Sequence, residues 1–219
     1  DVLICLFMDN SVGYNATKDA NTIGACAENT MSNWISVYTE NVVQMPKMWG
    51  DIFGMCMFAA LLALTRTAYA KFGKNIYRVL LMSMFGAVVC YSLVAFSSNA
   101  VLSVAACVAV GICSSMLWPG TLILMEERVP AVGVSAYALM AAGGDFGASF
   151  APQAMGIIVD KISVTEWAQN FGSSLSLSPE QVGFKVGMLI AAVFPILGVV
   201  LLLYMRKFFK IGHDAKQSK

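Results

Sequence analysis

The sequence predicts an all-α membrane protein with six transmembrane helices. The first reason is composition: of 219 residues, 58% are hydrophobic and 12% are charged, whereas about 25% are charged in ordinary soluble domains. The second is that the apolar residues gather in blocks of about 20, the length that crosses a bilayer. The third is that lysine and arginine concentrate in alternate connections between these blocks. We therefore expect one membrane-embedded bundle and no separate soluble domain.

Five blocks have the length and apolar character of a spanning helix. They are residues 51–70, 76–97, 101–125, 131–159 and 183–205. A shorter and more polar segment, residues 23–38, precedes them and is counted as the first of six spans. With six spans, the basic connections fall on one side and both termini lie in the cytoplasm. With five spans, the connections keep their sides but the chain enters from outside.

The distribution of basic residues sets the expected orientation, because short connections rich in lysine and arginine stay in the cytoplasm. The cytoplasmic set follows the second span, the fourth span and the last span: Lys71, Lys74, Arg78, Arg128, Arg206, Lys207, Lys210, Lys216 and Lys219. The opposite connections hold only Lys47, Lys161 and Lys185. We expect a multi-pass protein of the cell (inner) membrane with a cytoplasmic C-terminus.

The start of the chain interrupts this pattern. Residues 2–8 are apolar, residues 9–23 are polar, and a helical pattern resumes at residue 24. A polar break exposed to lipid is unfavourable, because backbone groups in hydrocarbon must be satisfied internally. We therefore divide the chain into an irregular or inserted segment (1–23), a six-helix half-bundle (24–210) and a polar cytoplasmic tail (211–219).

Polar side chains share one face of the first predicted span. At 100° per residue, this face holds Glu28, Asn29, Ser32, Asn33 and Ser36. Polar residues inside a membrane are candidates for function, so the stripe predicts contact with a solute or a coupling ion in a water-filled cavity. A helix lying at the membrane surface, or one distorted by the inserted segment, is the alternative.

The fifth span carries an isolated carboxylate in an Ala/Gly-rich run, MAAGGDFGASFAPQ. Asp145, Ser149 and Gln153 share a face, whereas Gly143 and Gly147 form a G-x-x-x-G seam that permits close helix packing on another face. Because desolvation disfavours a charged carboxylate, Asp145 is a candidate for substrate binding or proton coupling. The alternative is a structural Asp bonded to a neighbouring helix.

Two further positions belong to the candidate set. Ser114, Ser115 and Trp118 lie on one face of the fourth span just before Pro119, which should kink the helix. Trp118 can stack on a solute or close a gate, or it is an aromatic anchor at the membrane interface. Arg66, near the cytoplasmic end of its span, is interpreted as a gate or as a side chain that snorkels to water.

Other function classes find little support. The single histidine, His213, lies in the tail, so no span combines histidine with serine or with a metal-ligand cluster. No phosphate-binding G-x-x-x-x-G-K-[ST] motif occurs, and the net charge of +1 gives no reason to expect nucleic acid. We expect no enzyme activity, no cofactor and no metal site.

Four segments resemble the C-terminal half of a major facilitator superfamily transporter, and most closely the fucose-permease-like sugar permeases. They are GACAENTMSNWISVYTE, GDIFGMCMFAALLALTRTAYAKFGK, CSSMLWPGTLIL and MAAGGDFGASFAPQAMGIIVDK. The resemblance implies helices seven to twelve of a twelve-helix bundle. In that fold the first, second, fourth and fifth helices of each half bound the transport path, and here these are the helices of Glu28, Arg66, Trp118 and Asp145.

The expected function is secondary active transport of a small polar solute, a sugar, by proton symport with alternating access. The expected partners are the lipid bilayer, the solute, and either a missing N-terminal half or a second copy of the chain. A drug or metabolite exporter of the same superfamily is one alternative. A non-transporting, half-length membrane protein is the other.

Overall fold

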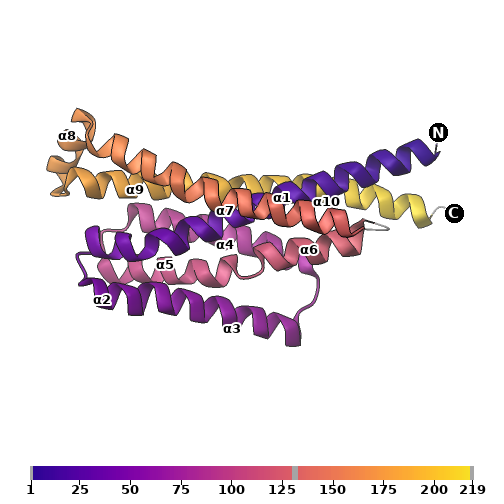
Figure 1. The fold of residues 1–219 in the computed structure, drawn as a ribbon, viewed down its shortest axis with the longest axis horizontal. Coiled ribbons are helices and arrows are strands. Elements are labelled where there is room, and N and C mark those ends of the chain that lie inside the picture. The colour runs from indigo at the N-terminus through magenta and orange to yellow at the C-terminus, as the bar shows by residue number, and fades with distance from the viewer. Residues whose placement is uncertain (1, 130–132, 218–219) are drawn as a thin grey trace.

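The computed structural model describes residues 2–129 and 133–217, and the regular structure of this part of the chain is entirely helical. Six rods run alternately up and down one bundle. Both chain ends lie at one end of the bundle, and the short helix α8 (Glu166–Leu175) lies at the other (Figure 1). The predicted all-α fold is confirmed for the described residues.

Several rods consist of more than one helix. In chain order the rods are α1 (Val2–Asn41); α2 (Lys47–Gly50), the π-helix η1 (Asp51–Cys56) and α3 (Met57–Phe72); α4 (Ile76–Phe96); α5 (Ala100–Ser114) with α6 (Leu117–Arg128); α7 (Val134–Ser163); and α9 (Pro179–Ala191) with α10 (Val193–Gln217). Helix α8, which joins α7 to α9, was not predicted.

Four rods are long and apolar enough to cross a membrane, whereas six spans were expected. The four are Lys47–Phe72, Ile76–Phe96, Ala100–Arg128 and Pro179–Arg206. Among the described residues, α1 and α7 do not reach this standard. These two rods carry the predicted polar stripes. The same polar residues make the rods less apolar and are the candidates for function.

Residues 9–23 lie within α1, where the sequence analysis expected an irregular or inserted segment. Local and tertiary bonds both support the helix here. The hydroxyls of Thr17 and Thr22 donate to backbone oxygens one turn earlier, at Gly13 (3.1 Å) and Lys18 (3.1 Å). Thr17 and Asn21 are fully buried, so polar residues of this segment pack inside the bundle.

Helix α1 is the central rod, in contact with α5, α6, α7, α9, α10 and η1. Its buried face is made by residues three, four or seven apart: Ala16, Ala20, Ala27, Met31, Ile35 and Tyr38. Two tyrosines fix it to α4. Tyr38 donates its hydroxyl to the Val94 oxygen (2.8 Å), and Tyr91 donates to the Ala27 oxygen (2.6 Å). These bonds satisfy buried phenols that would otherwise be costly.

The G-x-x-x-G seam of α7 is where α1 crosses it. A Cβ on Gly147 would lie 2.4 Å from the backbone oxygen of Thr22, and one on Gly143 would lie 2.8 Å from the Thr22 hydroxyl. Next to this crossing, Asn21 donates to the Met140 oxygen of α7 (2.7 Å) and accepts from the Thr121 hydroxyl of α6 (2.9 Å). Small residues therefore allow the close approach, and one amide joins three rods.

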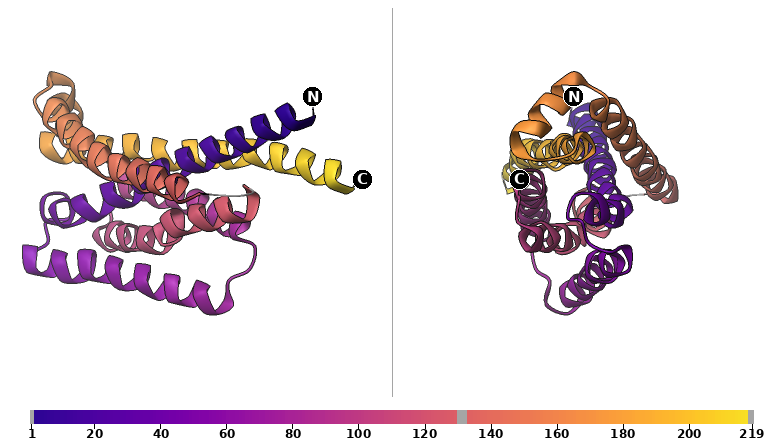
Figure 2. Two further views of the ribbon diagram at one scale, coloured as in Figure 1. Left: turned by 45° about the vertical axis from the view of Figure 1, so that its right-hand side comes forward. Right: turned by 90° about the vertical axis from the view of Figure 1, so that its left-hand side faces the viewer.

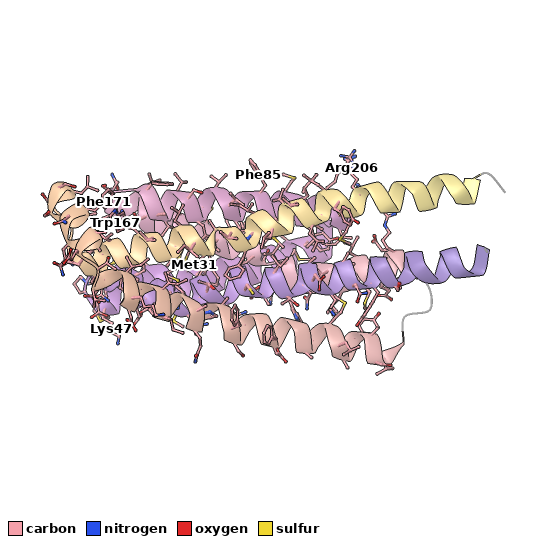
Figure 3. The ribbon with its side chains drawn as sticks, turned by 90° about the horizontal axis from the view of Figure 1, so that it is seen from above. Met31, Lys47, Phe85, Trp167, Phe171 and Arg206 are labelled. Carbon is pink, nitrogen blue, oxygen red and sulfur yellow. The ribbon has the colours of Figure 1, made fainter. Side chains whose placement is uncertain are left out.

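The alternation of the rods separates the two sets of basic residues. Figure 3 shows Lys47 and Arg206 at opposite ends of the bundle. The α3–α4 connection, which follows Lys71, and the end of α6 at Arg128 lie at the end of the bundle that holds both termini (Figure 1). The arrangement agrees with the expected sidedness; the cytoplasmic location of that end stays a prediction.

A few predicted positions lie outside the described residues. Residue 1 begins the predicted N-terminal segment, residues 130–132 include the start of the fifth predicted span, and residues 218–219 end the predicted tail. The rest of that tail continues α10 to Gln217.

Replacement of Asn21 by alanine should destabilise the bundle. The change removes both hydrogen bonds of the amide, and the Met140 oxygen loses the donor that Asn21 supplied. We expect this to cost about 1 kcal/mol of unfolding free energy. Thermal unfolding of the purified chain in detergent measures the loss. Asn15→Ala, at an exposed position of the same helix, is the control and should leave the transition unchanged. Equal effects of the two variants would contradict the role given to Asn21.

Candidate functional site

Polar side chains are exposed along one face of both α1 and α7, although these helices belong to an otherwise apolar bundle. On α1 the exposed polar residues recur at helical spacing: Asn15, Asp19, Asn33 and Glu40. On α7 they are Asp145, Ser149, Gln153 and Asp160. Next to the polar stripe of α7 runs an apolar one that includes the stacked rings of Phe146 and Phe150. One exposed face of α7 is therefore divided into polar and apolar halves.

The two polar stripes meet in a groove of about 620 Å³ between α1 and α7, called here the α1–α7 groove. Its lining joins three predicted site residues with residues that were not predicted: Asn33, Trp34, Val37, Ala148, Ser149, Pro152, Gln153, Gly156, Ile157 and Asp160. The groove offers an amide on each wall, a hydroxyl and a carboxylate, and none of the lysines and arginines whose side chains the structure describes lines it. This chemistry suits a neutral or cationic polar solute and disfavours an anion.

Trp34 and Asp160 are the groove residues that sequence reasoning missed. Asp160 continues the α7 stripe seven residues after Gln153, so the helical period contained a signal for it. Trp34 lies outside the polar stripe of the first predicted span. In the structure its indole N–H donates to the Pro152 oxygen (3.0 Å) and its ring lies against Gly156. The position follows from contact between two helices, which no single-helix pattern contains.

A second cluster links α1, α3 and the end of α5, and its centre is Arg66. The guanidinium forms an ion pair with Glu28 of α1, at 3.2 and 3.4 Å from the two carboxylate oxygens. Its Nε donates to the backbone oxygen of Ser115 (2.7 Å). The Glu28 side chain is 18% exposed and that of Arg66 is 38% exposed. Arg66 therefore makes contacts within the bundle that neither sequence interpretation included.

The Ser115 oxygen is free to accept this bond because of Pro119. A proline has no N–H and cannot bond the carbonyl four residues earlier, which here belongs to Ser115. The helix breaks at this point, since α5 ends at Ser114 and α6 begins at Leu117. Where a kink was predicted at Pro119, the helix is interrupted one turn before the proline, and the interruption supplies an acceptor that Arg66 occupies.

Trp118 and Ser114 lie on either side of the same break. Trp118 is 40% exposed, and its indole nitrogen would lie 2.9 Å from a Cβ placed on Gly144 of α7. The indole of Trp118, which belongs to α6, therefore packs against α7. Ser114 is fully buried, and its hydroxyl has no hydrogen-bond partner among the described residues. The structure places both next to the ion-pair cluster along the chain but outside the lining of the α1–α7 groove.

Asp145 is exposed on the stripe of α7, one turn before Ser149. Its carboxylate forms no hydrogen bond or ion pair with the described residues, although its backbone oxygen accepts from the Ser149 hydroxyl (2.9 Å). The structure therefore does not support the alternative of an Asp bonded to a neighbouring helix of this chain.

Asn29 and Ser32 precede the groove on α1 and are half-buried. The Asn29 amide donates to the backbone oxygen of Ala25 (3.0 Å). The Asn33 amide (2.8 Å) and the Ser32 hydroxyl (3.2 Å) both donate to the backbone oxygen of Asn29. Helix α1 thus satisfies these donors itself. The side-chain oxygens of the two asparagines remain as acceptors toward the outside of α1.

In the end-on view of Figure 2, α7 and α3 lie on either side of α1. The two clusters therefore share α1: Asn33 belongs to the groove with α7, and Glu28 to the ion pair with α3. Of the four predicted path helices, α1, α3 and the α5–α6 rod meet at Arg66, whereas α1 and α7 meet at the groove.

The ion pair should show strong coupling in a double-mutant cycle. Glu28→Ala or Arg66→Ala alone leaves one charge in a partly buried position without its partner. The unfolding free energies lost in the two single variants should therefore add up to more than the loss in the double variant. We expect a coupling energy of about 0.5–3 kcal/mol, measured from unfolding in detergent. The exposed residues Glu40 and Arg78 provide a control cycle, which should be additive. Additive losses at Glu28 and Arg66 would show that the pair contributes nothing.

The chain matches no model of a known protein family, no curated protein and no solved structure. The resemblance to major facilitator transporters therefore stays a prediction from the sequence. The described residues themselves provide the basis for a function: an antiparallel helical bundle, four apolar candidate spans, a polar groove and an ion pair beside a broken helix.

Proposed function

We propose that this chain forms one six-helix half of a secondary transporter of the major facilitator type, which moves a small polar solute across the cell membrane. The observation that carries the proposal is the exposed polar stripe on α1 and α7, with the α1–α7 groove between them. The stripe is unusual because the other four rods are apolar enough to span a bilayer.

Polar and ionisable groups inside a membrane are unfavourable against lipid and usually face a cavity or another helix. Asp145 and Asp160 both lie on the exposed side of α7, so this side needs water or a second protein surface. A second six-helix half, or a second copy of the chain, would cover it and enclose a water-filled path. Transporters built from two such halves hold their solute at this interface.

The groove favours a neutral solute that is rich in hydroxyl groups, such as a sugar. Asn33, Gln153 and Asp160 supply hydrogen-bond donors and acceptors from both walls, and Trp34 supplies a flat apolar surface. Sites for small molecules commonly combine a few placed polar groups with aromatic walls. The volume of about 620 Å³ falls within the ~300–1,000 Å³ of ligand pockets.

The ion-pair cluster is a suitable device for coupling transport to protons. A proton on Glu28 removes the negative charge that holds Arg66, which then keeps only the Ser115 oxygen as partner. Because Glu28 and Arg66 belong to different rods, the two charge states favour different positions of α3 relative to α1. Alternating access requires rods that move in this way between two arrangements.

Loss of the groove amide should impair transport. Gln153→Leu removes hydrogen bonds to the solute at little change in size, and we expect uptake to fall by about tenfold, the effect of one good hydrogen bond. The measurement is uptake of a panel of radiolabelled neutral monosaccharides by cells that express the gene encoding this chain. Gln169→Leu, at an exposed position on α8, is the matched control.

Three results would contradict the proposal. If no neutral sugar is accumulated but preloaded drugs or metabolites leave the cells faster, the protein is an exporter. If neither flux depends on expression, the chain is a membrane protein without transport activity. Normal uptake by Gln153→Leu would remove the groove from the solute path.

Neutralisation of Glu28 should separate transport from the proton gradient. Glu28→Gln resembles the protonated state, so solute should still equilibrate across the membrane but should no longer accumulate when the outside is acidic. The comparison is between uptake at external pH 5.5 and pH 7.5 in energised cells. Glu40→Gln, exposed on the same helix, should retain the pH dependence of the wild type. A Glu28→Gln variant that accumulates solute with unchanged pH dependence would exclude Glu28 from coupling.

A further inference from the structure

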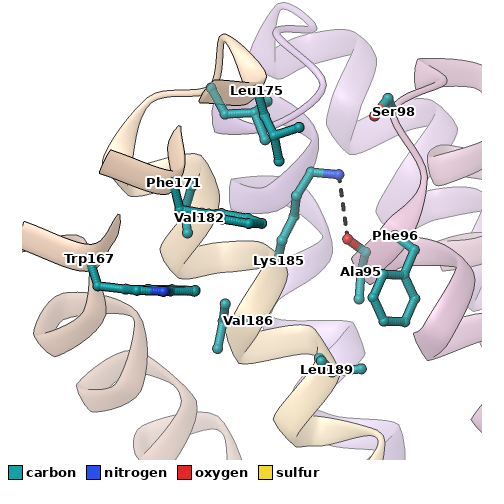
Figure 4. Close-up of a pocket in the computed structure, with 11 residues that line it drawn as sticks. Ala95, Phe96, Ser98, Trp167, Phe171, Leu175, Val182, Lys185, Val186 and Leu189 are labelled. Carbon is teal, nitrogen blue, oxygen red and sulfur yellow. Dashed lines mark hydrogen bonds between the residues drawn. The ribbon is translucent and has the colours of Figure 1, made fainter. Parts of the chain in front are cut away.

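A second cavity lies at the end of the bundle opposite the chain termini, and its lining differs in character from that of the polar groove. It has a volume of about 260 Å³ and is bounded by α8, α9 and the end of α4. Most of its lining is apolar, as Trp167, Phe171, Val182, Val186 and Leu189 illustrate. Figure 4 shows the side chain of Lys185 running between the residues of α8 and those at the end of α4.

Helix α8 is amphipathic and presents its apolar ridge to this cavity. Trp167, Phe171 and Leu175 recur every four residues, and all three line the cavity and remain 44–55% exposed. Ala168 and Gly172 are buried where α8 packs on α7 and α9. The opposite face is polar and exposed: Glu166, Gln169, Asn170 and Ser173. A short helix with this division lies flat at a membrane interface, with its aromatic side toward the acyl chains.

Lys185 places one cation in these apolar surroundings. Its ammonium donates to the backbone oxygens of Ala95 (3.5 Å) and Ser97 (2.5 Å), at the end of α4. An ammonium has three donors, so one remains. None of the described carboxylates forms an ion pair with it. A cation in a partly apolar site is stabilised by a counter-ion, and the described part of this chain does not supply one.

Lys185 lies near one end of the last candidate span. It stands six residues after Pro179, the first residue of α9 and of the last candidate span, which is about 9 Å along the helix. The cavity is continuous with exposed apolar residues of two spans, Leu189 of α9 and Phe96 of α4. A ligand can therefore reach it from the bilayer without crossing water.

From this arrangement we infer that the cavity is a binding site for an anionic phospholipid of the surrounding leaflet. The phosphate accepts the remaining donor of Lys185, and one acyl chain lies along the ridge of α8. The volume of about 260 Å³ is below that of pockets that enclose a drug-sized molecule. It suits a segment of a long ligand whose remainder stays in the bilayer. The inference requires only that the bundle sits in a membrane, and it holds whether or not the chain transports a solute.

Native mass spectrometry of the purified chain in detergent tests the site. The probes are dioleoylphosphatidylglycerol and dioleoylphosphatidylcholine, which have the same acyl chains but differ in headgroup charge. We expect the anionic lipid to be retained about fivefold more than the zwitterionic one, as one lysine at a lipid surface provides. Lys185→Met should abolish this preference, and Lys185→Arg should keep it. Lys161→Met, an exposed lysine at the same end, should behave as the wild type.

Three outcomes would contradict the inference. Equal retention of both lipids by the wild type would overturn the inference, and this reading does not depend on any variant folding. Preference lost in Lys161→Met but kept in Lys185→Met would assign the lipid to another surface. Inorganic phosphate is the third probe: if it displaces the anionic lipid at millimolar concentration, Lys185 binds free anions and the apolar cavity has no part in recognition.

Discussion

The close crossing of α1 and α7 is the contact on which the rest of the structure depends. Gly147 has no side chain where the Thr22 backbone oxygen passes, and Asn21 bonds both α7 and α6 beside it. Without a driving force from water, helices in lipid associate through such small-residue packing and through interhelical hydrogen bonds. The crossing brings the polar stripes of the two helices side by side, and the α1–α7 groove is the consequence.

A missing hydrogen bond is used in a comparable way at the other cluster. Pro119 cannot donate to the Ser115 oxygen, and the rod divides into α5 and α6 at that point. Nε of Arg66, on α3, donates to this free oxygen, and Nη2 of the same side chain holds both carboxylate oxygens of Glu28. One proline in one rod therefore fixes the position of an arginine in a second and of a carboxylate in a third. A change in the charge of Glu28 would therefore act where the α5–α6 rod already lacks one backbone hydrogen bond.

The distribution of apolarity among the rods separates two tasks. The four apolar candidate spans provide the surface that lipid can cover, while α1 and α7 carry the groups that lipid disfavours. This division explains why the polar residues 9–23 can be helical. Thr17 and Asn21 are fully buried; Thr17 bonds within its own helix, whereas Asn21 bonds α6 and α7. Local hydrogen bonds and the surrounding bundle therefore both stabilise this segment.

The sequence by itself determined the helical class, the approximate bounds of the apolar spans, the break at Pro119, the G-x-x-x-G seam and the shared face of Ser149 and Gln153. Each of these depends on one chain segment, through apolar length, a missing N–H or the helical period. Asp160 was within reach of the same reasoning. The length of α1 was not, because the bonds of Asn21 to α6 and α7 join residues of separate rods.

Only the tertiary structure decided which faces meet. The pairing of Glu28 with Arg66, the bond from Trp34 to Pro152 and the position of Lys185 beside α4 each join residues from different rods. Periodicity gives a side chain its angle around its own helix axis, but it contains nothing about the neighbour that this angle will face. That choice follows from packing among all six rods, and so the groove, the ion pair and the cavity under α8 emerged with the fold.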